Sequence, residues 1–467
     1  MTVDAVVIGA GISGLAVAHA LGKRGRSVVV LESAARAGGV IATVRRDEAL
    51  YERGPNSTLD TSPRIGELLR DLAIEPERVD AGAVAAHRYI VRGGTLRELP
   101  TSAAALVSSN AFTPRAKLRL LREPFIAPAP DDAEESIAAF VRRRLGQEFL
   151  DYAIDPFVAG IYAGDAERIS VAAAFPRLLA LERKYGSLVK GQVRGARERR
   201  ASGEVAKNAA ASFSFRNGMQ TLTDALAGTL AGLECDVRVT GIAREAGAFV
   251  VTGMRAGESV VRRGRCLVLA VPAPAAGTLV AGLAPEAARA LAAIEYAPVA
   301  IIASLYRRGD VAHPLAGFGF LVPKKEKRTI LGTLFSSSMF AGRAPDGSVL
   351  LTTFAGGRRN PEVLALPDAA LAASVRSELA DLVGARGAPQ WQEIVRWPQA
   401  IPQYELGHLD RLRHVDAAEA NVPGLYFCAN YRDGVAVGDR IRQGDEMAAR
   451  IDRHLADHAP TPGASAA

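Results

Sequence analysis

Apolar residues open the chain in one short run, Val3–Ile8, and a second apolar run ends just before Glu32. Runs of this length bounded by glycines predict buried strands, and the segment between them has the spacing of a helix. The turn after the first run reads Gly9-Ala10-Gly11-Ile12-Ser13-Gly14. The opening of the chain therefore predicts a strand, a glycine turn, a helix and a second strand, as in an α/β fold.

Later segments alternate between helical and strand-like apolar spacing. Helices are expected at Ile65–Leu72, Ser136–Leu145 and Leu371–Val383, and residues from about 84 to 190 are mostly helical in pattern. Strands are expected at Val237–Ile242, Phe249–Thr252, Leu267–Val271, Val299–Leu305, Gly317–Val322, Ile330–Phe335 and Val349–Phe354. The tail from Gly424 repeats the pattern of strand, glycine loop and helix. This order predicts a nucleotide-binding domain built from both ends of the chain, with other domains inserted.

The composition is that of a globular protein with more than one domain. The chain has 467 residues, which is long for a single core, with 49% hydrophobic and 23% charged residues. The three cysteines lie far apart, which argues against a disulfide framework or a zinc site and for a reducing compartment, and we expect no metal. The first strand leaves no room for a leader peptide, and prolines interrupt the apolar stretch Cys266–Pro285. A cytoplasmic protein without a membrane-spanning helix is therefore expected.

Basic residues are unevenly distributed in a chain whose net charge is +7. They dominate residues 177–207, and a shorter segment has Arg115, Lys117, Arg119 and Arg122 with leucines between them. This pattern fits a solvated basic face, a nucleic-acid site or an amphipathic surface on anionic lipid. Stacking aromatics and nucleic-acid-binding motifs are lacking, so nucleic acid is not expected as a partner. From composition alone the other two alternatives stay open, with lipid slightly favoured.

The opening glycines fit a dinucleotide. Gly9 permits the tight turn, Gly11 lets the backbone approach a pyrophosphate, and Gly14 lets the helix pack closely on the sheet. Unpaired amides at the helix N-terminus would bind the phosphates, and Glu32 is spaced to accept hydrogen bonds from ribose hydroxyls. An ordinary glycine-rich turn is the alternative.

Two segments beyond Glu32 help to distinguish one dinucleotide from another. Arg36-Ala37-Gly38-Gly39 resembles flavoproteins with two dinucleotide-binding signatures, and Gly54-Pro55-Asn56-Ser57 has the composition of a cofactor-side loop. Nicotinamide enzymes do not need the first of these segments. FAD is therefore favoured over NAD.

Several longer stretches are more specific than the glycine turn. They include Glu52-Arg-Gly-Pro-Asn-Ser57, Arg88-Tyr-Ile-Val-Arg92, Ile154-Asp-Pro-Phe-Val-Ala-Gly160 and Gly317-Phe-Gly-Phe-Leu-Val-Pro323. With these, nearly the whole chain resembles the oxygen-dependent protoporphyrinogen oxidases, in the amine-oxidase-like branch of FAD proteins. The resemblance implies a Rossmann-like FAD-binding domain with an inserted mixed-sheet substrate domain and a helical membrane-binding domain. It also implies a homodimer bound peripherally to the cytoplasmic face of a membrane.

The resemblance divides the chain into six segments. FAD-binding parts are expected at 1–80, 215–280 and 396–467, substrate-domain parts at 191–214 and 281–395, and the helical membrane-binding domain at 81–190. It assigns FAD contacts to Gly9, Ala10, Gly11, Ile12, Ser13, Gly14, Glu32, Ser33, Gly39, Gly54, Pro55, Asn56, Ser57, Val239, Trp397, Val435, Ala436 and Val437. The tail departs from the family pattern at Ala429 and at Arg432-Asp433, which leaves contacts there less certain than the cofactor.

The implied substrate is a porphyrinogen, a large apolar ring with carboxylate arms. The resemblance places Leu321 and Leu334 on one wall of its pocket, Phe354 on the other, and Ala163 and Gly164 in a loop above it. Arg88 aligns with an arginine that holds a propionate, a role suited to a permanently charged planar fork. Core packing is the alternative for the apolar residues, and a surface ion pair is the alternative for Arg88.

The implied reaction converts protoporphyrinogen IX to protoporphyrin IX, with oxygen as acceptor and hydrogen peroxide as by-product. Hydride transfer from a methylene bridge to the flavin needs no side chain with a strictly catalytic role, and the sequence has no nucleophilic triad that would supply one. Coproporphyrinogen III oxidation is the nearest alternative. Another amine-oxidase-like flavoprotein and a non-catalytic binding protein are more remote.

Overall fold

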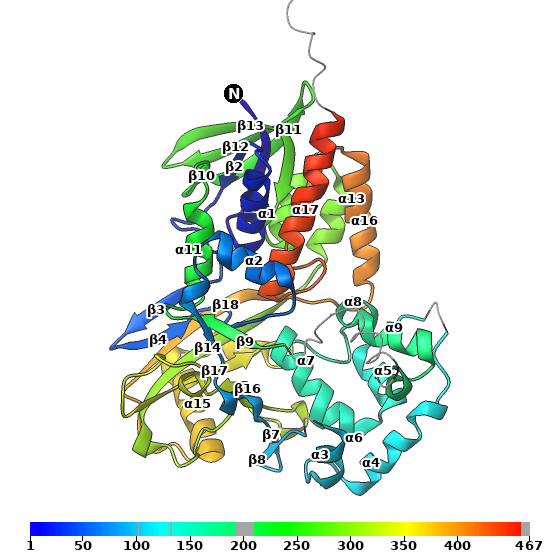
Figure 1. Ribbon diagram of the computed structural model, residues 1–467, viewed down its shortest axis with the longest axis vertical. Helices are drawn as coiled ribbons and strands as arrows, with labels where there is room; N and C mark the ends of the chain where they lie inside the picture. The colour runs from blue at the N-terminus through cyan, green and yellow to red at the C-terminus, as the bar shows by residue number, and fades with distance from the viewer. Residues whose placement is uncertain (101, 131–132, 193, 195–209, 459–467) are drawn as a thin grey trace, which may run out of the picture.

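The computed structural model describes residues 1–100, 102–130, 133–192, 194 and 210–458. Two seven-stranded sheets form its framework, and a group of helices lies beside the second sheet (Figure 1). Strands and helices alternate in the first half of the first sheet, as the opening apolar runs predict. The result is a mixed α/β fold.

The first sheet has a parallel half and an antiparallel half. Its strands are β10 (Leu233–Glu234), β2 (Val28–Leu31), β1 (Thr2–Ile8), β13 (Glu258–Leu269), β12 (Ala248–Arg255) and β11 (Arg238–Glu245), with β19 (Leu425–Phe427) also paired to β13. β10, β2, β1, β13 and β19 are parallel, and β11, β12 and β13 form an antiparallel meander. The carboxyl ends of the parallel strands therefore share one edge.

Helices cover both faces of this sheet. Val7 and Val268 face α1 (Ile12–Lys23), α11 (Gln220–Gly228) and α17 (Val437–Asp457). Val6 and Leu267 face α12 (Ala273–Val280), α13 (Pro285–Ala292) and α16 (His408–Asn421). Because successive residues of a strand point to opposite faces, apolar residues at every position require cover on both sides. This explains why the apolar runs are continuous rather than alternating.

The second sheet is mostly antiparallel. Its order is β18 (Trp391–Pro402), β14 (Tyr296–Arg307), β17 (Ser348–Gly356), β16 (Ile330–Leu334), β15 (Gly319–Leu321), β7 (Arg88–Arg92) and β8 (Thr95–Glu98). One face packs on α15 (Asp368–Val383) through Leu371, Val375 and Leu379. The other face meets α7 (Asp155–Tyr162) at β15 and β16, and Ala49 and Tyr51 pack on it at β14, β17 and β18.

Two small sheets and a short helix connect these units. The hairpin is β3 (Thr43–Arg46) with β4 (Ala49–Glu52), and the three-stranded sheet is β5 (Thr58–Leu59), β9 (Ser212–Phe215) and β6 (Arg78–Asp80). The helix α2 (Pro63–Asp71) follows β5 and is capped by the Ser62 side chain.

The helical group consists of short segments around two apolar clusters, one that includes Phe140, Val158 and Ile169 and one that includes Phe112, Ala116 and Phe149. They are α3 (Ala103–Ser108), α4 (Pro114–Leu121), α5 (Ile137–Arg144), α6 (Gln147–Phe149), α7 (Asp155–Tyr162), α8 (Val171–Ala174) and α9 (Pro176–Tyr185). The described part of the chain contains no helix with both the length and the hydropathy of a membrane-spanning segment.

The sequence-based elements are largely confirmed, with one clear difference. The expected helices match α2, α5 and α15, and each expected strand from residue 237 onward has a counterpart. The expected helical pattern from about 84 is wrong at its start, because residues 88–98 form β7 and β8 of the second sheet. Each of these two strands is so short that its alternation of apolar and polar residues cannot be distinguished from a helical pattern by sequence. The division into domains stays a prediction.

Candidate functional site

The glycine turn joins β1 to α1, and each glycine has a separate reason to lack a side chain. Gly9 has φ of +100°, and a Cβ there would lie 2.8 Å from the Ala270 carbonyl oxygen. A Cβ on Gly14 would strike the Gly9 carbonyl. A Cβ on Gly11 would meet nothing within 4 Å. Gly11 therefore leaves open space in front of the helix, which a phosphate could occupy.

Glu32, at the end of β2, lies beside this turn. One carboxylate oxygen accepts a hydrogen bond from the Ala10 amide at 2.7 Å, and the other accepts from Ala34 at 2.8 Å and from the Ser33 hydroxyl at 3.3 Å. The acid is therefore fixed at the carboxyl edge of the parallel strands. This is the position from which an acid can accept ribose hydroxyls.

The segment after Glu32 folds back onto the turn. Gly38 donates to the Ala10 carbonyl at 2.7 Å, and a Cβ on Gly39 would lie 3.2 Å from the Gly11 Cα. The Arg36 guanidinium donates to three backbone carbonyls of its own loop. The loop 54–57 is adjacent, since a Cβ on Gly54 would strike the Val40 carbonyl. The predicted residues 9–14, 32–33, 39 and 54–57 are thus brought together.

A second helix N-terminus faces the same edge. Gly444 of α17 packs against Ala16 of α1, and the two helices run side by side in the same direction (Figure 1). Their N-cap residues, Gly11 and Ala436, make no side-chain capping hydrogen bond, a feature they share with other helices such as α12 and α13. Both N-termini therefore present unpaired amides and positive dipole ends, which favour an anion. Of the predicted residues, Val437 begins this second helix, Ala436 is its N-cap, and Val435 comes just before it.

The two remaining predicted cofactor residues come from the two large sheets. Val239 is in β11, two residues after Val237, whose amide donates to the Glu32 carbonyl at 2.8 Å. Trp397 is in β18, and its indole Nε1 donates to the Arg53 carbonyl at 2.6 Å. This hydrogen bond connects the second sheet to the residue before the loop that begins at Gly54.

The predicted substrate residues share one face of the second sheet. Leu321 is opposite Gly332, which is opposite Phe354, and Arg88 is opposite Gly319, which is opposite Leu334. Paired residues direct their side chains to the same face. The backbones are close at both glycines, since a Cβ on Gly332 would strike the Phe320 carbonyl and a Cβ on Gly319 would strike the Thr333 carbonyl. Trp397 and Phe354 belong to the same apolar cluster, which includes Val299 and Ile301.

The helix α7 covers part of this face. A Cβ on Gly160 would lie 3.0 Å from a methyl of Leu321, so the helix approaches closely. Ala163 ends α7 with φ of +47°, and its carbonyl accepts from the Arg358 amide at 2.8 Å. Gly164 is packed against Ile169 and the Gln403 side chain. Ala163 belongs to the same apolar cluster as Phe354, whereas Gly164 faces protein, and their contact with a substrate stays a prediction.

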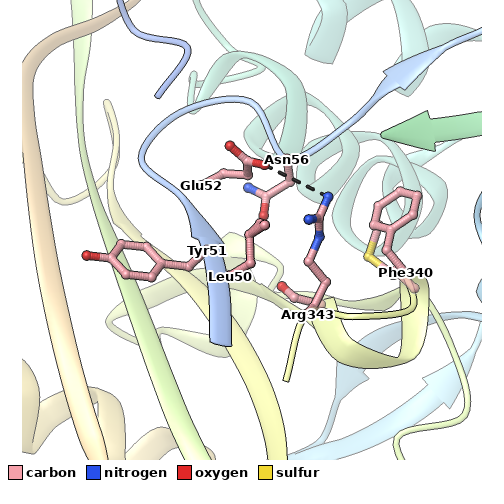
Figure 2. Close-up of a pocket in the computed structure, with 8 residues that line it drawn as sticks. Leu50, Tyr51, Glu52, Asn56, Phe340 and Arg343 are labelled. Carbon is pink, nitrogen blue, oxygen red and sulfur yellow. Dashed lines mark ion pairs between the residues drawn. The ribbon is translucent and has the colours of Figure 1, made fainter. Parts of the chain in front are cut away.

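Figure 2 shows a water-sized cavity beside the loop 54–57. Asn56 lines it together with Glu52 and Arg343, whose charged groups are 3.9 Å apart and almost fully buried. Burial raises the pKa of Glu52 to about 7, although hydrogen bonds from the Met219 amide and the Thr43 hydroxyl act to lower the pKa. Burial also lowers the pKa of Arg343.

A larger cleft of about 480 Å³ lies at the turn between β15 and β16. Three of its cations, Lys324, Arg328 and Arg359, already pair with carboxylates behind the surface. The cleft is therefore close to electrostatic balance, and we assign it no ligand. Neither cavity is lined by Arg88, Leu321, Leu334 or Phe354.

The sequence did not reveal residues that support the site from a distance. The Tyr404 hydroxyl donates to the Asn430 carbonyl at 2.7 Å and accepts from the Gly434 amide at 3.1 Å. Glu52 and Arg343 are much further apart in the chain and also meet only in the folded protein. Only the tertiary fold creates these contacts, so no local pattern could have indicated them. Among the described residues, no three His, Cys, Asp or Glu side chains are arranged to hold a metal.

The fold and the glycine-rich edge define a dinucleotide-binding protein of the flavoprotein type. The model of the family "Flavin containing amine oxidoreductase" matches residues 12–452. The chain therefore belongs to this family, and its cofactor is FAD. The uncapped N-termini of α1 and α17, the open space at Gly11 and the fixed Glu32 fit that dinucleotide.

Similar proteins agree with this assignment. The chain is 32% identical to protoporphyrinogen oxidase 2 of Arabidopsis thaliana, covering 96% of this chain and 94% of that one. It is 27% identical to coproporphyrinogen III oxidase of Bacillus subtilis, covering 94% and 96%. A solved structure from Exiguobacterium sp. 255-15, with a provisional protoporphyrinogen oxidase name, has a TM-score of 0.80 at 23% identity, covering 97% and 99%. That last likeness concerns the fold alone.

Proposed function

We propose that this chain oxidises protoporphyrinogen IX to protoporphyrin IX, with molecular oxygen as electron acceptor and hydrogen peroxide as by-product. Six hydrogens leave the substrate in three two-electron rounds, and each round reduces one oxygen molecule to one peroxide. FAD, when bound, accepts hydride from the substrate and passes the electrons to oxygen. The protein supplies orientation and an apolar enclosure.

The observation that carries this proposal is the arrangement on one face of the second sheet. Trp397, on the edge strand β18, is hydrogen-bonded to the cofactor-side loop, and Arg88 is on β7, next to the opposite edge strand β8. Leu321, Leu334 and Phe354 lie between them. An apolar ring with a carboxylate arm fits such a face, because its arm can reach a cation while its ring contacts hydrocarbon. In this proposal the second sheet is the substrate domain.

Coproporphyrinogen III is the competing substrate. It has more carboxylates, and a relative named for its oxidation is 30% identical to this chain. Against it, the relatives named protoporphyrinogen oxidases are 31–33% identical, and Arg88 is the one cation among the predicted substrate residues. The test is to mix the yellow holoprotein anaerobically with each porphyrinogen and to follow bleaching of the flavin. Faster bleaching and higher kcat/KM with protoporphyrinogen are expected, and preference for coproporphyrinogen would replace this proposal with the alternative.

We also propose that the helical group binds a membrane surface. Four apolar side chains protrude around α3, α4 and the turn after them: Val107, Leu118, Leu121 and Phe125, with exposed fractions of 76%, 64%, 70% and 87%. Arg115 and Arg122 are exposed on the same segment. This combination suits insertion among anionic headgroups. Figure 1 places α3 and α4 at the end of the molecule opposite the C-terminus of α17.

The exposed turn that carries Phe125 is fixed by two buried charged residues, Glu123 and Arg144. Glu123, fully buried, accepts hydrogen bonds from the Leu188 amide at 2.8 Å and from the Arg144 guanidinium at 3.3 Å. Arg144 is fully buried too and also donates to the Ile126 carbonyl at 2.9 Å. The exposed Phe125 therefore lies on a turn whose conformation is fixed by these hydrogen bonds, as membrane insertion requires.

Sedimentation with vesicles containing anionic lipid tests this second proposal. The triple variant Leu118→Ser, Leu121→Ser, Phe125→Ser should lose most vesicle binding, since each apolar side chain contributes about 1.5–3 kcal/mol when buried. Val261→Ser, an exposed apolar position on β13, is the control and should bind as the wild type does. Equal binding of the triple variant would refute the surface. Attachment on the cytoplasmic face and assembly as a homodimer belong to the same proposal, and light scattering tests the dimer.

A further inference from the structure

The loop between β19 and α17 has an unusual hydrogen-bond arrangement. Five consecutive backbone carbonyls, those of residues 429–433, each accept from a side chain. Arg440 donates to Ala429 at 2.6 Å and to Arg432, Tyr404 donates to Asn430 at 2.7 Å, His408 donates to Tyr431 at 2.9 Å, and Gln443 donates to Asp433 at 3.1 Å. The loop therefore takes its shape from side chains that surround it.

This loop needs external support. Asp433 and Gly434 have φ of +56° and +115°, and α17 begins three residues later at Val437, with Ala436 as its N-cap. Asp433 adopts the left-handed conformation, which is unfavourable for most residues with a side chain. The direction in which α17 begins, and hence the direction of its unpaired amides, depends on the groups that hold residues 429–434.

Among these groups, Tyr404 differs in where it comes from. Arg440 and Gln443 are on α17 itself, but Tyr404 follows β18 of the second sheet. Its carbonyl accepts from the Ser170 amide of the helical group at 2.8 Å, and its ring lies 5.5 Å from that of Tyr162 on α7. One residue thus contacts the helical group through its backbone and ring, and the start of α17 through its hydroxyl.

His408 keeps the Tyr404 ring in place. The two rings are stacked with centroids 4.3 Å apart and planes 12° from parallel. A carbonyl can only accept, so Nε2 of His408 carries the proton that binds the Tyr431 carbonyl. Burial lowers the pKa of His408 to about 4 and raises that of Tyr404, so His408 is neutral and Tyr404 keeps its proton at neutral pH.

We infer that Tyr404 is a positioning residue for the cofactor: with His408, it sets the N-terminus of α17 against the FAD from outside the nucleotide-binding sheet. This inference rests on the proposed contact between FAD and residues 435–437. Its consequence is that Tyr404 couples the helical group to the cofactor-binding loop, alongside Val435, which packs on the core of the same group.

Tyr404→Phe removes the hydroxyl and keeps the ring. We expect the Kd of the apoprotein for FAD to rise about tenfold, measured by the fluorescence of titrated FAD, and the visible spectrum of the bound flavin to shift. Tyr306→Phe is the matched control, because the Tyr306 hydroxyl is equally buried and has no hydrogen-bond partner among the described residues. FAD should raise the Tm of this control as much as that of the wild type, and raise that of Tyr404→Phe less.

His408→Phe decides the question if Tyr404→Phe does not fold. It keeps a stacked ring, removes the donor to Tyr431, and also removes a buried Nδ1 that has no partner among the described residues. A weaker affinity for FAD with an unchanged Tm of the apoprotein is expected. The inference is refuted if whichever of these two variants folds binds FAD as tightly as the wild type does. It is also refuted if the decrease in Tm relative to the wild type is the same with and without FAD.

Ala436→Glu separates this failure from failure of the proposed cofactor contact. A carboxylate at the exposed N-cap of α17 would occupy the anion position without disturbing the helix. Weaker FAD binding in Ala436→Glu together with normal binding in Tyr404→Phe would overturn only the role of Tyr404. Normal binding in Ala436→Glu would overturn the contact between FAD and α17 itself.

Discussion

The guanidinium carbon of Arg88 lies 5.2 Å from the centroid of the Phe318 ring. Contact with the ring face stabilises the cation without using its hydrogen-bond donors, because the ring offers only its π electrons. Arg88 is exposed at the start of β7, so its donors remain available to a ligand on this face of the second sheet. The pair Arg88–Phe318 therefore presents a charge next to an apolar surface, as an arm of a carboxylated ring would require.

Arg88→Ala should weaken substrate binding and leave FAD content unchanged. Loss of a hydrogen bond to a charged partner costs about 1.5–3 kcal/mol, so KM for protoporphyrinogen should rise roughly 10- to 100-fold. Arg88→Lys should recover part of the loss, because a lysine keeps the charge but not the planar fork. Steady-state kinetics and the flavin-to-protein absorbance ratio measure the two effects.

Arg307→Ala is the control for Arg88. Arg307 is an exposed arginine of the same sheet, at the end of β14 that pairs with Ser348, away from the apolar row. Its loss should not alter KM. An unchanged KM in Arg88→Ala would remove Arg88 from the substrate site.

Gly11 and Gly14 should respond differently to the same methyl group. In Gly11→Ala the new Cβ enters open space, so the apoprotein should fold and keep its Tm while FAD affinity falls steeply. In Gly14→Ala the Cβ strikes the Gly9 carbonyl, so the protein itself should lose stability. Thermal unfolding of the apoproteins and FAD titration distinguish the two. Full FAD affinity in Gly11→Ala would show that the phosphates lie elsewhere.

These glycines also illustrate how much of the candidate site can be predicted from the sequence. The spacing of Gly9, Gly11, Gly14 and Glu32 is sufficient to place them, because one strand, one turn and one helix fix their geometry. Residues 88–98 resemble part of a helical segment, because short strands have no sequence period long enough to identify them. The contacts of Tyr404 and Arg343 depend on chain segments that meet only in the folded protein, so local pattern could not predict them.

The buried Glu52 should make stability depend on pH. Its pKa is raised to about 7 in the folded protein, from about 4.5 in the unfolded chain, so the folded protein binds the extra proton between these values. Its contribution to the free energy of unfolding is therefore complete below pH 4.5 and is lost as pH rises through 7. At about 1.4 kcal/mol per pKa unit, the loss is on the order of 3 kcal/mol.

Glu52→Gln removes this titration. Denaturant unfolding of both proteins at about pH 5 and about pH 8 should show that the wild type loses stability relative to Glu52→Gln as pH rises. The Gln side chain can still accept from the Met219 amide, which makes the comparison close to isosteric. Parallel pH dependence in the two proteins would contradict a raised pKa for Glu52.

Substitutions on opposite faces of β17 should separate an effect on substrate binding from an effect on stability. Phe354 is half-buried on the face that carries Leu321, whereas Leu351 is fully buried against α15 on the other face. Phe354→Ala should raise KM about 10- to 100-fold with little change in Tm, because it removes contact with an apolar ligand worth about 1–3 kcal/mol. Leu351→Ala should lower the free energy of unfolding by about 2–5 kcal/mol and leave KM unchanged, because it opens a cavity in the core. If Phe354→Ala lost stability as Leu351→Ala does and kept its KM, this face would be ordinary core rather than a wall of the substrate site.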